Sequence, residues 1–153
     1  MLSKIKTFFQ DQLMLKTQDT PQQAMHRLQL GVAALLLEMV HVDGVKRPEQ
    51  CARVESAIRA HFDLSDDETD RLIELAEAER NEATDYFQFT SLINGQHTPE
   101  QKVALIEQLW RVALADNELH SHEEHLVRKI AQLLHVPHSA YIAAKHRAEA
   151  EKG

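Results

Sequence analysis

The sequence predicts an all-α fold, a single-domain bundle of about seven helices with pseudo-duplicated helical hairpins. Helix-capping motifs recur along the chain, and apolar residues follow each of them at helical spacing. No segment alternates apolar and polar residues as a half-buried strand does. Only four glycines and 5% aromatic residues among 153 positions also favour helices over a turn-rich β architecture. A chain of this length forms one core.

Four capping motifs divide the chain. In each, a Ser or Thr hydroxyl can accept a hydrogen bond from a first-turn amide, and a Glu or Gln three residues later reaches back. They are Thr20–Gln23, Ser65–Glu68, Thr98–Gln101 and Ser121–Glu124. With the apolar spacing, they predict helices from Pro21 to near Asp43, Pro48 to His61, Ser65 to about Asn81, 85 to 94 (ended by Gly95), Thr98 to Asp116, Ser121 through Leu133, and from Pro137 onward.

The two halves of the chain resemble each other. "LLLEMVHVDGVKRPEQCARV" matches "LWRVALADNELHSHEEHLV" and aligns Asp43 with Asp116 at an offset of 73 residues, whereas Leu64 and Val136 align at 72. Both segments read as an apolar helix, an Asp turn, a linker and a second helix. An internal duplication would bring the two turns together across a pseudo-twofold axis. Two unrelated amphipathic hairpins would give a similar pattern, so both interpretations stay open.

Charge and composition limit the classes of function. A formal net charge of −7 argues against nonspecific nucleic-acid binding and favours cations or basic surfaces as partners. The longest apolar run, Val32 to Leu37, is far below the roughly 18 residues of a membrane span, and the N-terminus lacks the pattern of a signal peptide. The single cysteine, Cys51, fits a reducing compartment and lies on an apolar stripe. We therefore expect a cytoplasmic location.

The first residues form a separate amphipathic segment. Leu2, Ile5, Phe8, Phe9 and Leu13 fall along one helical face beside Lys4 and Lys6. Such a segment can dock onto its own domain, onto a second copy in a homodimer, or onto another protein. Peripheral membrane contact is the weaker alternative, because two lysines attract lipid only slightly.

Acidic residues crowd the two predicted turns. If the turns converge, Asp43, Asp116, Glu118, Glu123 and Glu124 would repel one another, and a hard cation such as Ca²⁺ or Mg²⁺ would relieve the repulsion. The histidines His41, His120 and His122 would shift the preference toward Zn²⁺ or another transition metal. The alternative is architectural, because the helix dipole favours carboxylates in a first turn without any ligand.

Several known chemistries are excluded by spacing. Neither Asp turn has the Gly and Glu positions of an EF-hand, and His122-Glu-Glu-His125 lacks the zincin spacing. The chain has no Gly-rich phosphate loop, no Gly-x-Ser-x-Gly elbow and no Cys-x-x-Cys pair. We therefore expect no enzymatic activity.

Three segments resemble the TerB-like (tellurite resistance protein B-like) family. They are "LLLEMVHVDGV", "DYFQFTSLIN" and "LIEQLWRVALADNELHSHEEHLVRKIAQLLHVPHSAYIAAKHRA", and the resemblance covers about residues 25 to 148. It implies a helical bundle of pseudo-duplicated hairpins over residues 21–150, after an N-terminal amphipathic helix and linker over 1–20. It also implies association with tellurite and other chemical stress.

The resemblance further implies an acidic cluster for divalent cations at Asp43, Asp116, Glu118, Glu123 and Glu124. Asn117 stands where the family usually has Gly, and Asn tolerates the same backbone conformation. Our leading hypothesis is a non-enzymatic protein that binds Ca²⁺, Mg²⁺, Mn²⁺ or Zn²⁺ through this cluster. The alternative is a metal-free adaptor or scaffold for an unknown protein partner, membrane-associated through its N-terminal helix.

Overall fold

Seven helices make up the described part of the chain, which in this computed structural model is residues 20–42, 44, 47–80, 87–116 and 118–152. The helices are α2 (Pro21–His41), α3 (Pro48–Phe62), α4 (Asp66–Arg80), α5 (Phe87–Gln96), α6 (Pro99–Ala113), α7 (Ser121–Leu133) and α8 (His138–Lys152). These residues contain no strand. The prediction of an all-α bundle is therefore confirmed, whereas the predicted N-terminal amphipathic helix lies outside the described residues.

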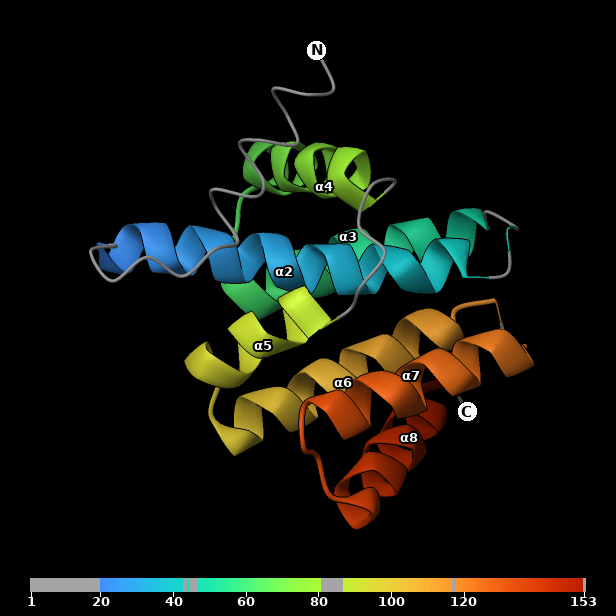
Figure 1. The fold of residues 1–153 in the computed structure, drawn as a ribbon. Helices are drawn as coiled ribbons and strands as arrows, with labels where there is room; N and C mark the ends of the chain where they lie inside the picture. The colour runs from blue at the N-terminus through green and yellow to red at the C-terminus, as the bar shows by residue number, and fades with distance from the viewer. Residues whose placement is uncertain (1–19, 43, 45–46, 81–86, 117, 153) are drawn as a thin grey trace.

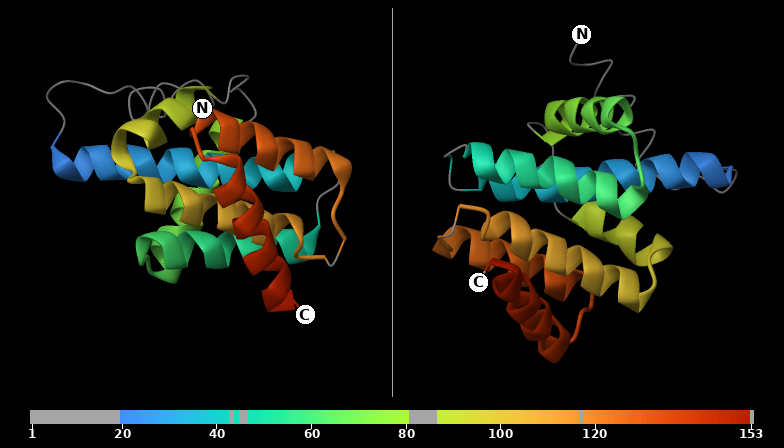
Figure 2. Two further views of the ribbon diagram at one scale, coloured as in Figure 1. Left: turned by 90° about the horizontal axis from the view of Figure 1, so that it is seen from below. Right: turned by 180° about the vertical axis from the view of Figure 1, so that it is seen from behind.

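Helix α2 runs through the middle of the bundle (Figure 1). It packs against α3, α4, α5 and α6, while α6 packs against α3, α7 and α8. The arrangement repeats, because α4 packs on α2 as α8 packs on α6, and α5 follows the first three helices (Figures 1 and 2). Within the described ranges, no helix has both the length and the apolar character needed to cross a membrane.

The second helix of each half ends in the same way. Asp63 after α3 and His135 after α7 are 72 residues apart and both adopt a left-handed backbone, with φ of 54° and 60°. The next amide then donates to a carbonyl five residues back, Leu64 to Arg59 at 3.3 Å and Val136 to Ala131 at 2.9 Å. The pseudo-duplication of the helical hairpins, predicted at this same offset, is confirmed.

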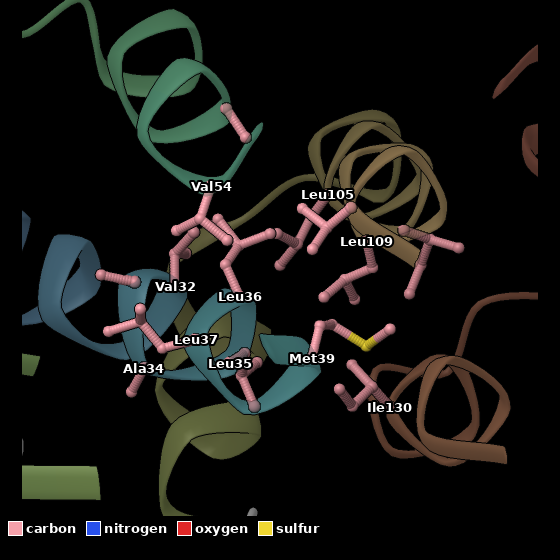
Figure 3. Packing of buried hydrophobic residues seen from close by; sticks show 14 of the residues in the cluster. Val32, Ala34, Leu35, Leu36, Leu37, Met39, Val54, Leu105, Leu109 and Ile130 are labelled. Carbon is pink, nitrogen blue, oxygen red and sulfur yellow. The ribbon is translucent and has the colours of Figure 1, made fainter. Parts of the chain in front are cut away.

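The core explains why α2 is apolar on nearly all sides. A helix covered by neighbours all round buries more than one stripe, and residues Val32 to Leu37 are all at most 4% exposed. Figure 3 shows the contact between the halves, with Leu36 and Met39 of α2 facing Leu105 and Leu109 of α6. Val54 of α3 and Ile130 of α7 extend this cluster on either side. Trp110 is fully buried, as its apolar position predicts.

Three of the four predicted capping boxes are present. The hydroxyls of Thr20, Ser65 and Thr98 accept from the backbone amide three residues on, and the side chain there accepts in return. The predicted end of α5 at Gly95 is wrong by two residues. The helix continues through Gln96, and the amide of His97 still donates to Ile93.

Candidate functional site

The two interhelical turns lie at the same end of the bundle (Figure 2). Arg47, the residue before α3, reaches from the first half to the turn of the second. Its Nε lies 3.2 Å from Oδ2 of Asp116, and its Nη1 lies 4.0 Å from Oε2 of Glu123. One cationic side chain of the first repeat thus holds two carboxylates of the second.

Asp116 shapes its own turn as well as binding Arg47. Its Oδ1 accepts from the backbone amide of Glu118 at 3.2 Å, the local bond of an Asx turn. Its Oδ2 lies 3.4 Å from Nε2 of His120. The Asp116 side chain is 15% exposed, so solvent screens these contacts only in part.

Glu123 is fully buried and serves the start of α7. Its Oε1 accepts from the backbone amide of His120 at 3.3 Å, and its Oε2 accepts from the side-chain amide of Gln50. Burial raises the pKa of the Glu123 carboxyl. The hydrogen bonds from Gln50 and His120 and the charge of Arg47 act against that rise.

The predicted capping box at Ser121 is wrong by one residue. Helix α7 begins at Ser121, the preceding His120 is its N-cap, and Glu123 reaches back to it. The carboxylate of Glu124 points elsewhere, 4.0 Å from Nζ of Lys145 on α8. Glu123 therefore has the architectural role that the sequence pattern predicts for Glu124.

The five predicted cation ligands are divided between different surroundings. Asp116 and Glu123 meet at Arg47, Glu118 is exposed, and Glu124 is exposed beside α8. Asp43 lies outside the described residues. Among the residues the structure describes, no group of three His, Cys, Asp or Glu side chains could hold a metal ion.

The histidines considered as alternative ligands are also separated. His120 lies beside Asp116, and His122 is exposed on α7. His41, at the end of α2, has its Nε2 2.8 Å from Glu77 of α4.

The donor set nevertheless suits a cation. Asp116 and Glu123 come from the turn and the helix that follows it, and both place an oxygen within 4.0 Å of the Arg47 guanidinium. Arg47 is thus an internal stand-in for a cation. A metal ion taking these oxygens would have to displace it, because two cations at one pair of carboxylates repel each other.

Sequence reasoning did not identify Arg47 and Gln50 as site residues. An Arg before Pro48 and a Gln in a first helical turn are ordinary at such positions. The repeat offset carried the signal, because adding 73 to Arg47 and Gln50 gives His120 and Glu123. In a pseudo-twofold contact, equivalent positions meet near the axis.

Comparison with known proteins gives one match. The family model described as tellurite resistance protein TerB matches residues 29–146. The curated proteins and the solved structures gave no match. The matched range includes both repeats and both turns.

Proposed function

Because the chain belongs to the TerB family, we propose that it is a non-enzymatic, tellurite-stress-associated protein that binds a divalent cation at its turn face. The turn face is defined as Asp43, Asp116, Glu118 and Glu123. The observation that carries the proposal is the convergence of Asp116 and Glu123 on Arg47. These carboxylates already hold a positive charge, and oxygen donors of this kind suit hard divalent cations.

Cation binding would act by ordering the two turns. A bound cation would neutralise carboxylates from the turn face and release Arg47 from Asp116. Since Arg47 directly precedes α3, its release would loosen one link between the repeats while the cation forms another. The exposed Glu118 is free to rotate toward such a cation, whereas Glu123 is held by Gln50 and the His120 amide.

The test is a titration of the metal-free protein with Ca²⁺, Mg²⁺, Mn²⁺ and Zn²⁺, followed by amide resonances. We expect saturable shifts at residues 114–120, lost in Asp116→Asn and kept in Glu149→Gln, an exposed carboxylate of α8. If none of the four ions moved these resonances, the proposal would be wrong. A response to Zn²⁺ alone that survives Asp116→Asn would assign binding to the histidines.

A metal-free adaptor is the second candidate, and one observation favours it. Arg47 already neutralises Asp116, so the fold needs no added ion at this place. Such a protein would act through its surface or through residues 1–15. Deleting residues 1–15 should then abolish partner or vesicle association in a protein that shows no cation response.

A further inference from the structure

A pocket of about 350 Å³ between α7 and α8 gathers basic side chains on an otherwise acidic protein. Arg128 and Lys145 line it together with the imidazoles of His125 and His138. Glu124 is the one carboxylate among the described lining residues. A local excess of positive charge within a chain of net charge −7 attracts anions to this place.

The basic character continues around α7. A second hollow shares His125 and Arg128 with the first and is also lined by His122 and Lys129. No carboxylate lines this second hollow within the described residues. The spacing of His122, His125 and Lys129 is three and then four residues, which places them on one exposed face of the helix.

The donors of the pocket are held in place by its aromatic floor. The Tyr141 ring packs on Trp110, with centroids 5.3 Å apart, and on His138 at 5.6 Å. Lys145 Nζ lies 5.2 Å from the centroid of the same Trp110 ring. Burial, and then the nearby charge of Glu124, raises the pKa of the Tyr141 hydroxyl, so it stays protonated and can donate.

We propose that this pocket binds a small, soluble phosphate monoester. Arg128 and Lys145 bind the phosphate, while the hydroxyls of Ser121 and Tyr141, which also line the pocket, donate to its remaining oxygens. Among the described residues, Arg128 has no hydrogen bond or ion pair, so its guanidinium donors are available. The proposal does not depend on the turn face binding a cation.

The number of donors favours phosphate over carboxylate. Four donor side chains of different elements exceed what the two oxygens of a carboxylate accept well, whereas a phosphate monoester presents three terminal oxygens. The pocket volume also exceeds that of a phosphate group. Its apolar lining, with Ile142 beside the Tyr141 ring, leaves room for an organic substituent.

The test is a calorimetric and NMR titration of the full chain with inorganic phosphate, glycerol 3-phosphate and acetate at constant ionic strength. We expect saturable shifts on α7 and α8 with the two phosphates and none with acetate. Arg128→Gln and Lys145→Gln should each weaken binding about tenfold. Glu124→Gln should strengthen it severalfold, because it removes the opposing charge beside Lys145. Arg53→Gln, which removes a cation paired with Glu151 elsewhere, is the matched control.

Three results would overturn the proposal. One is weakening by Arg53→Gln equal to that by Arg128→Gln, which would indicate nonspecific attraction. Another is weaker binding in Glu124→Gln when circular dichroism shows a folded variant. The third is binding to phosphatidic acid vesicles without binding to glycerol 3-phosphate, which would assign the face to a membrane.

Discussion

The side-chain amide of Gln50 donates a hydrogen bond to the carboxylate of Glu123, which lies 73 residues later at the equivalent place in the second repeat. Both side chains are fully buried. Equivalent residues of a pseudo-twofold repeat meet here as donor and acceptor, because one half carries an amide where the other carries a carboxylate. Two carboxylates at this contact would repel each other, and two apolar residues would leave the His120 amide without its partner.

The first prediction removes this asymmetry. Gln50→Glu buries a second carboxylate against Glu123 and should lower the free energy of unfolding by about 3 kcal/mol at pH 7. Part of the loss should return near pH 5, because the pair can then share a proton. Urea unfolding at both pH values measures this, and Ser56→Glu on the exposed side of α3 is the control. Equal losses in both variants would show that charge alone, rather than this contact, matters.

The second prediction concerns Glu123 itself. Glu123→Gln keeps an oxygen for the His120 amide, and its new amide can donate to Oε1 of Gln50, a buried atom with no partner among the described residues. We expect a change under about 1 kcal/mol, whereas Glu123→Ala should lose about 2 to 3 kcal/mol by leaving both donors unsatisfied. Chemical unfolding of the two variants tests this, and similar losses would contradict it.

The sign of a pH effect follows from the raised pKa of Glu123. The folded protein holds this proton more tightly than the unfolded chain does, so the stabilisation is complete below about 4.5. It is lost as the pH rises through the folded pKa. Relative to the wild type, Glu123→Gln should therefore become more stable as the pH is raised above 4.5, and a difference independent of pH would contradict the assignment.

The third prediction uses a pair of buried imidazoles. Nε2 of His61, on α3, lies 3.0 Å from Nε2 of His97 before α6. Burial, and then the charges of His61 and Lys102, lower the pKa of His97 to about 4, although the carbonyl of Gln96 opposes this. Burial also lowers the pKa of His61. At neutral pH one neutral ring can donate to the other.

Acid should therefore destabilise the fold at this contact. Below about pH 6.5 the unfolded chain takes up protons that the folded pair excludes, so stability falls as the pH decreases from 6.5 toward 4. The loss from His97 is about 3 kcal/mol. His97→Gln should flatten the decline in a pH series of unfolding curves, and exposed His122→Gln should not. An equally steep decline in His97→Gln would refute this origin.

Local sequence rules predicted most of the fold. The boxes at Thr20, Ser65 and Thr98 form as expected, because each depends only on a hydroxyl, four neighbouring residues and the backbone between them. At α7 two registers compete, and residues 120 and 123 prevail over 121 and 124. The difference is tertiary, since Gln50 of the other repeat binds Glu123 and fixes it inside the protein. No rule restricted to one helix contains that contact.

The candidate site was predictable only in part, for the same reason. Acidic residues at Asp116 and Glu123 are visible in the sequence, but their neutralisation by Arg47 depends on how the repeats meet. The offset of 73 residues is the one sequence feature that relates the two sides. Applied residue by residue, it pairs Gln50 with Glu123 before any coordinates are known.

The most direct measurement is divalent-cation affinity in Arg47→Gln compared with the wild type, by calorimetry on protein freed of metal. If a cation takes the place of the guanidinium, removing that competing charge 3.2 Å from Asp116 should strengthen binding about fivefold, while Arg53→Gln leaves it unchanged. Circular dichroism checks that the variant is folded. Binding that is weaker or unchanged in folded Arg47→Gln, or absent from both proteins, would contradict a cation site at the turn face.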